Sequence, residues 1–166
     1  MDRDEVAWVR AALAGETAAF RCLYERFGPL VHGVLLARAP RQDVDDLVQE
    51  VFVVAFERLA SLRDPGAFGA WIATIARTKA IDHGRVARIV SSGDAAEVGR
   101  EDPDRAAAEE ALAAIRTLPE AYRETLVLRL VEGLTGPEIA AKTGLTPESV
   151  RVNLHRGMAL LREALE

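Results

Sequence analysis

Four side chains near the end of the chain are of the types that read DNA: Arg151, Asn153, His155 and Arg156. Guanidinium and imidazole groups bind guanine edges or phosphates, and a carboxamide pairs with adenine. They lie on or near the side of a predicted helix opposite its apolar residues, which recur at helical spacing: Val150, Leu154, Met158, Leu161 and Leu165. This arrangement predicts contact with duplex DNA.

The element that must present these side chains is a helix-turn-helix between residues 134 and 165. Its junctions carry the residue types that helix ends and tight turns prefer: Thr135, Gly144, Thr146, Pro147 and Glu148. Thr135 and Thr146 are the expected N-caps, and Gly144 provides the left-handed backbone of the turn. Such a unit lays its second helix in the major groove.

A plain helical hairpin with a solvated outer face is the alternative. Residues 116–166 hold seven basic and seven acidic residues, so their net charge is zero. A protein that holds DNA alone usually has a basic surface, because phosphate neutralisation supplies most of the affinity. The unit is therefore not expected to bind DNA strongly by itself.

Composition narrows the class of protein further. Net charge is −5, the pI is about 5.3, and 49% of residues are hydrophobic, which excludes wholesale disorder and disfavours a membrane-surface protein. Cys22 stands alone and is expected to be a buried, inert thiol. We expect no metal site, no cofactor, no catalytic residues and no membrane insertion, and a cytoplasmic location, because the acidic N-terminus is unlike a signal peptide.

Helical periodicity predicts an all-α fold of two small domains joined by a flexible acidic linker. The domains are expected at 1–90 and 105–166, with the linker at 91–104; residues 91–112 carry a net charge of −5 and begin Ser-Ser-Gly. Four helices outside the helix-turn-helix follow from the pattern: 16–39 with a possible kink at Pro29, 43–59 capped by Asp43, 68–90, and one from Leu118-Pro119 to Gly133.

Two surfaces of the first domain could carry function. The first, the acidic face, lies on the helix at 43–59: Asp43, Asp45, Asp46, Gln49 and Glu50. Its charges suit a helix N-terminus, and they would also suit a basic partner. The second, the basic segment at 63–90, contains Arg63, Arg77, Lys79, Arg85 and Arg88, and follows a loop. Basic residues beside a loop suit single-stranded nucleic acid, whereas Phe68 and Trp71 are expected to be core.

Three stretches, in order, resemble the bacterial RNA polymerase sigma factors of the extracytoplasmic-function (ECF) type. DVDDLVQEVFVVAFERL is similar to the helix that docks on core polymerase, and SLRDPGAFGAWIATIARTKAIDHGR to the segment that melts and reads the −10 element. LPEAYRETLVLRLVEGLTGPEIAAKTGLTPESVRVNLHRGMALLREAL resembles the domain that reads the −35 element. The resemblance covers nearly the whole chain.

The resemblance assigns roles to individual residues. It places the acidic face on core polymerase. It places the loop 61–67 and the helix after it on the −10 strand, with these candidates: Leu62, Arg63, Arg77, Thr78, Lys79, Asp82 and Arg85. On the −35 element it places Thr146, Glu148, Arg151, Val152, Asn153, His155 and Arg156. Core RNA polymerase, promoter DNA and an anti-sigma factor are the implied partners, and no regulatory domain is expected after the recognition helix.

Three positions depart from the family pattern. Many relatives have Asn where Thr78 stands, and a Ser-Arg pair in place of Val152-Asn153. Asn prefers adenine edges and Val152 suits a thymine methyl, so we expect an altered −35 preference or a weaker dependence on that element.

Two other classes of protein compete with this interpretation. A stand-alone regulator would use only the helix-turn-helix, with the first domain as a sensor, and would bind duplex DNA without polymerase. A helical adaptor that sequesters a partner would have no effect on DNA. The neutral charge of the helix-turn-helix and the acidic face disfavour the regulator.

Overall fold

The structure, a computed structural model, describes residues 3–90 and 103–166, and all regular elements in those ranges are helices. They are α1 (Arg3–Leu13), α2 (Thr17–Leu36), α3 (Arg41–Glu57), α4 (Phe68–Val90), α5 (Pro103–Thr117), α6 (Glu120–Leu130), α7 (Gly136–Thr143) and α8 (Pro147–Leu165), with 3₁₀ turns at Leu59–Ser61 and Pro65–Ala67. The all-α expectation is confirmed. The predicted linker lies outside the described residues, except for 103 and 104, which begin α5.

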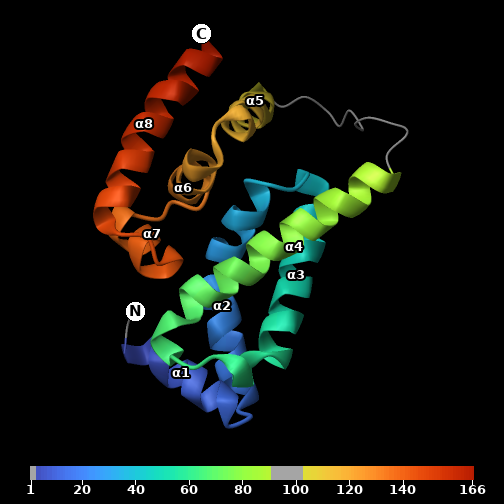
Figure 1. Ribbon diagram of the computed structural model, residues 1–166, viewed down its shortest axis with the longest axis vertical. Coiled ribbons are helices and arrows are strands. Elements are labelled where there is room, and N and C mark those ends of the chain that lie inside the picture. The colour runs from blue at the N-terminus through green and yellow to red at the C-terminus, as the bar shows by residue number, and fades with distance from the viewer. Residues whose placement is uncertain (1–2, 91–102) are drawn as a thin grey trace.

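Helices α1 to α4 form the N-terminal bundle, in which α2, α3 and α4 all pack on one another (Figure 1). Phe27 and Phe68 are fully buried, with an edge-to-face contact between ring centroids 4.9 Å apart, which is a favoured aromatic geometry. Trp71, expected to be core, is half-buried, as is Cys22. Helix α2 continues through Pro29, whose ring lies on its exposed side.

One local prediction for this bundle was wrong, and one helix was missed. Helix α3 begins at Arg41 with Pro40 as its N-cap, so Asp43 lies inside the first turn and does not cap the helix. The Asp43 carboxylate instead contacts the ring of His83 in α4. Helix α1 was not predicted, although Val9 and Ala12 bury one side of it against α2.

The predicted helix-turn-helix is present as α7 and α8. Thr135 accepts a hydrogen bond from the Glu138 amide while the Glu138 side chain accepts one from the Thr135 amide, which is a complete capping box. Gly144 ends α7 with φ of 76°, the left-handed conformation that the turn requires. Thr146 caps α8 by accepting a hydrogen bond from the Ser149 amide at 3.1 Å.

The buried side of α8 differs from the predicted stripe. Val150 and Leu161 are buried, but Met158 and Leu165 are 38% and 47% exposed. Gly157 lies at the contact instead, because Leu126 and Tyr122 of α6 approach to within about 3.1 Å of where its Cβ would be. A close helix crossing thus replaces the expected row of large side chains.

The two predicted domains are in direct contact in this structure. Helix α6 packs against α2, and α7 packs against α4, so that α6 and α7 lie between α8 and the N-terminal bundle (Figure 1). The sequence predicted domains held together by a tether and did not predict this packing.

Candidate functional surfaces

The acidic face lies along α3 on the outside of the N-terminal bundle. Asp45, Asp46, Gln49 and Glu50 are exposed, and Asp43 is half-buried. Val44, Leu47, Val48 and Val51 fill the opposite side of the helix and are buried, which fixes the acidic face outward. This face is available to a partner protein.

The acidic face is joined to α4 by two polar side-chain contacts. Lys79 Nζ lies 2.9 Å from Glu50 Oε2, and His83 Nε2 lies 2.9 Å from Asp43 Oδ2. The candidate polymerase contacts and the candidate −10 contacts therefore lie on neighbouring helices. A partner that binds Glu50 also changes the surroundings of Lys79.

The loop before α4 presents one candidate residue and buries another. Arg63 is exposed, and Asp64 caps the 3₁₀ turn by accepting a hydrogen bond from the Gly66 amide at 2.8 Å. Leu62, expected to contact DNA, is only 9% exposed and belongs to the hydrophobic core. We therefore assign Leu62 to core packing and leave it out of the candidate DNA surface.

The outer side of α4 carries the other −10 candidates. Asp82 and Arg85 are exposed, with 4.0 Å between Arg85 Nη1 and Asp82 Oδ1. Thr78 is exposed, and its hydroxyl donates to the Thr74 carbonyl oxygen at 3.0 Å. Arg77 differs from the rest because it points toward the C-terminal domain, where Glu124 binds it through two hydrogen bonds of 2.7 and 3.0 Å.

The N-terminal half of α8 is the candidate −35 surface. Arg151, His155 and Arg156 are exposed, and Arg151 lies 3.6 Å from the carboxylate of Glu148. Val152 and Asn153 are half-buried. Arg151, His155 and Arg156 are thus open to solvent on α8, as a helix that enters a major groove requires.

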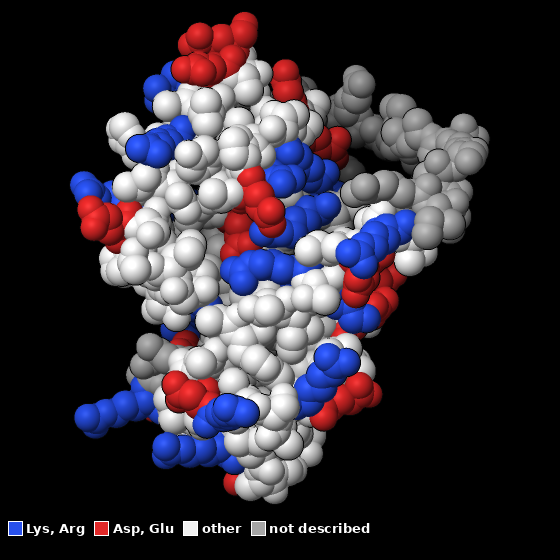
Figure 2. Space-filling model, viewed as in Figure 1, with Lys and Arg blue, Asp and Glu red and all other residues white. Residues whose placement is uncertain are grey.

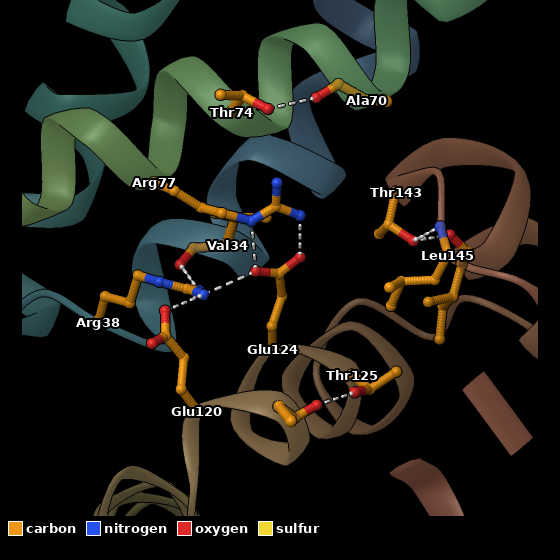
Figure 3. Close-up of polar contacts among 12 residues, drawn as sticks. Val34, Arg38, Ala70, Thr74, Arg77, Glu120, Glu124, Thr125, Thr143 and Leu145 are labelled. Carbon is orange, nitrogen blue, oxygen red and sulfur yellow. Dashed lines mark hydrogen bonds and ion pairs between the residues drawn. The ribbon is translucent and has the colours of Figure 1, made fainter. Parts of the chain in front are cut away.

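A network of charges between the domains was not predicted from the sequence. Glu124 of α6 lies between Arg77 of α4 and Arg38, in the turn that follows α2, and Arg38 also binds Glu120 (Figure 3). The side chains of Arg38 and Glu124 are each 10% exposed. The hydrogen bonds to Glu124 raise the pKa of Arg77 above its ordinary value, so the Arg77 guanidinium stays charged. Figure 2 shows basic and acidic side chains gathered across the middle of the face, where α6 lies next to α4.

Two further cations of the C-terminal domain bind the N-terminal bundle. Lys142 of α7 is buried, with its ammonium 4.4 Å from the Phe27 ring centroid and 3.9 Å from Glu5, and its pKa is lowered by burial. Arg116 of α5 donates to the carbonyl oxygens of Leu36, the last residue of α2, and of Ala39, at 2.9 and 2.6 Å. No sequence signal links these residues, because each pair is separated by about 80 residues or more along the chain.

His32 contacts Glu132 across the same interface, with 2.5 Å between Nδ1 and Oε1. The pKa of His32 is raised, chiefly by this hydrogen bond and also by the charge of Asp45, while burial and Arg41 oppose the rise. A histidine whose folded-state pKa is raised stabilises the protein fully below its unfolded value of 6.5, and the contribution is lost as pH rises through the folded pKa.

The expected result is that His32→Gln destabilises the chain more at about pH 6 than at about pH 9, by about 0.5–1 kcal/mol for this partly exposed pair. Urea unfolding at both pH values, with His155→Gln as the control for loss of an exposed imidazole, measures the difference. An equal decrease in the free energy of unfolding at both pH values would show that the charge of His32 does not stabilise the fold.

Over residues 3–90 and 103–166, the structure places no group of three or more His, Cys, Asp or Glu side chains where it could hold a metal ion. Among the described residues, no helix has the length and apolar character needed to cross a membrane.

Comparison with known proteins identifies both domains. Residues 23–89 match the Sigma-70 region 2 family, and residues 108–161 match the Sigma-70 region 4 family. CarQ, an RNA polymerase sigma factor of Myxococcus xanthus, is 34% identical over 91% of this chain and 91% of its own length. The ECF sigma factor ShbA of Streptomyces griseus is 34% identical over 96% of this chain and 94% of its length. The chain belongs to the ECF sigma factors.

Solved structures of sigma factors share the fold. The structure of CnrH in complex with the cytosolic domain of CnrY covers 97% of this chain at 28% identity, with a TM-score of 0.69. The complex of RpoE with the anti-sigma factor NepR from Bartonella quintana covers 87% at 19% identity, with a TM-score of 0.59, and supports the fold alone. The chain spans 64% of the length of another relative, the ECF sigma factor BldN of Streptomyces coelicolor. This sigma factor therefore consists, in its matched part, of regions 2 and 4.

Proposed function

We propose that this sigma factor directs core RNA polymerase to specific promoters. The acidic face of α3 binds core polymerase, the loop at 61–67 and the outer side of α4 melt and read the −10 element, and α8 reads the −35 element. Region 2 and region 4 are the parts of sigma factors that serve polymerase binding and promoter recognition, and both are present here. The protein supplies specificity to the polymerase and no chemistry of its own.

One observation carries the proposal: each domain exposes the surface that its family role needs. Region 2 exposes the acidic face beside a basic helix, and region 4 exposes the N-terminal half of a capped recognition helix. Weak contacts of this kind become strong when one partner holds both domains, because the second contact is then made at high effective concentration. This explains how a chain with a net charge of −5 can serve at a promoter.

Run-off transcription tests the proposal directly. Purified core polymerase is given a pool of promoter fragments with and without this protein, and promoter-specific transcripts that depend on the protein are expected. A gel shift on the same fragments without polymerase tests the stand-alone regulator, which would bind duplex tightly. Tight binding without any transcript would favour that regulator, and no effect in either assay would favour the adaptor.

The −35 preference is expected to depend on Asn153. Asn153→Arg should add guanine contacts and shift the preferred base at one −35 position, since a bidentate pair discriminates by about 1–3 kcal/mol. The readout is transcription from a promoter library randomised at the −35 element, and Asn153→Ala separates the loss of the amide from the gain of the guanidinium. Unchanged promoter strength and base preference in both variants would exclude Asn153 from DNA reading.

An anti-sigma factor is a further proposed partner. The support is the CnrH structure, in which a sigma factor of similar extent holds the cytosolic domain of CnrY. Such a protein would have to cover the polymerase or promoter surfaces of this chain to inhibit it. Loss of run-off transcription on addition of a purified candidate, restored by excess sigma factor, would identify it.

A further inference from the structure

The solvent side of α4 carries methyl groups over about two turns. Thr74, Thr78 and Ile81 follow one another at intervals of four and three residues, which places them on one side of the helix. All three are exposed, Ile81 to 53%. Ala76 and Ala80 lie on the opposite side of α4 and are buried. We call the surface formed by Thr74, Thr78 and Ile81 the methyl face.

The hydroxyl groups of both threonines are turned toward their own helix. Thr74 donates to the Ala70 carbonyl oxygen at 2.9 Å (Figure 3), and Thr78 donates to the Thr74 carbonyl oxygen at 3.0 Å. A hydroxyl has one proton to donate, and in both residues the helix takes it. Neither threonine therefore offers a donor to a base, and the methyl branch at Cβ is the part of each side chain left for a ligand.

Charged side chains lie at the edges of the methyl face. Lys79 points toward α3, where it binds Glu50. Arg85 lies one turn beyond Ile81 on the same side of α4, and its Nη1 atom is 4.0 Å from Asp82 Oδ1, which is too long for a hydrogen bond. The Arg85 guanidinium can therefore bind a backbone phosphate of a strand whose bases lie on the methyl face.

The chemistry of the methyl face matches one base better than the others. A single exposed isoleucine is ordinary on a protein surface, but this one continues a row of methyl groups on the helix that follows the loop at 61–67. Thymine carries a C5-methyl group, and side-chain methyl groups recognise it by apolar contact. The polar edges of the other bases would meet methyl groups on this surface and lose hydrogen bonds to water.

We propose that the methyl face selects thymines of the −10 element through their C5-methyl groups. This inference rests on the proposed function, because the methyl face matters only if α4 meets promoter DNA. Thr78 and Ile81 contact the methyl groups, and Arg85 binds a phosphate of the same strand. Asn at position 78, as in many relatives, would instead offer an amide that can hydrogen-bond a base edge.

Deoxyuridine is the probe, because it differs from thymidine only in lacking the C5-methyl group. Each thymine of the −10 element, in either strand, is replaced singly in the most active promoter fragment found by run-off transcription. Binding of each fragment to the full chain assembled with core polymerase is measured by competition. Loss of one methyl contact is expected to weaken binding about fourfold, at one or two positions of the element.

Thr78→Ser and Thr78→Val separate the methyl group from the hydroxyl. Serine keeps the hydroxyl and lacks the methyl group, whereas valine keeps the methyl group and has a second one in place of the hydroxyl. Thr78→Val is expected to retain the preference for thymidine over deoxyuridine, and Thr78→Ser to lose it at the position that Thr78 contacts. A preference that persists in Thr78→Ser would overturn the assignment, because the hydroxyl or another residue would then read the base.

Ile81→Ala tests the second residue of the methyl face and is expected to abolish the preference at a neighbouring position. Val86→Ala is its matched control. Val86 is also an exposed apolar residue of α4, at 59%, but it lies five residues further along and therefore points about 140° away from Ile81. This control should keep the native preference. Circular dichroism establishes that each variant keeps its helices.

The outcomes separate this inference from the proposed function. Promoter-specific transcription together with equal binding of thymidine and deoxyuridine fragments would overturn methyl reading and leave the proposed function intact. Selection of a −10 element without thymine would do the same. Absence of any transcript that depends on this protein would overturn the proposed function, and this inference with it.

Discussion

Reversing two charges of the acidic face, in Asp46→Lys with Glu50→Lys, is expected to abolish promoter-specific transcription. Both side chains are exposed on α3, one turn apart, so the change replaces a local charge of −2 by +2 without touching the core. Like charges facing one another across an interface cost several kcal/mol, which corresponds to a loss of about 100-fold or more in affinity. The readouts are binding to core polymerase and run-off transcription at limiting sigma factor.

Glu57→Lys is the matched control for this pair. Glu57 is an exposed glutamate at the end of the same helix, outside the acidic face, and a lysine there suits the helix C-terminus. Its transcription should equal that of the native protein. Glu50 binds Lys79 of α4, so its replacement also changes the surroundings of Lys79; Asp46→Lys is therefore measured alone as well. Full activity of the double variant would show that core polymerase docks elsewhere.

Removing two guanidinium groups from α8, in Arg151→Ala with Arg156→Ala, is expected to lower transcription from promoters that need the −35 element by about 100-fold. Each lost base or phosphate contact costs about 1–3 kcal/mol. Both side chains are exposed, and Arg151 pairs with its helix neighbour Glu148 at the surface, where an ion pair contributes little, so folding should be unaffected. Run-off transcription on matched promoters with and without a −35 element measures the effect.

Arg162→Ala provides the comparison on the same helix. Arg162 is exposed near the end of α8, about 16 Å from Arg151 along the axis, and recognition helices contact bases with their N-terminal residues. This variant should transcribe normally. An equal loss on promoters lacking the −35 element would show that Arg151 and Arg156 act other than by reading it.

Local signals in the sequence predicted the helices and the helix-turn-helix well. Thr135, Gly144 and Thr146 occupy the caps and the turn as expected, because capping depends on atoms within three or four residues along the chain. The acidic face was also found, since its position follows from the period of the buried side chains on the same helix. The exact start of α3 was missed, because Pro40 and Asp43 are both acceptable near a helix N-terminus.

Burial on α8 could not be predicted from periodicity alone. Met158 and Leu165 have the spacing of core residues but remain exposed, whereas Gly157 is buried. Which of these positions is covered depends on how closely α6 crosses α8, and that distance is set by Leu126 and Tyr122 on the other helix. Leu62 illustrates the same limit, because its place in the core depends on the bundle around the loop.

The sequence by itself determined most of the helices, the caps of α7 and α8, the outward face of α3, and the resemblance to sigma factors, because each depends on residues close together in the chain. Only the tertiary structure decided that Arg77 is bound by Glu124, His32 by Glu132, and that Gly33 lies against Leu128. These partners are separated by 47 to 100 residues, and no local pattern marks them. A charged residue on a helix surface follows the same sequence pattern whether it faces water or another domain. Only the tertiary packing distinguishes a solvent-exposed charge from one at a domain interface.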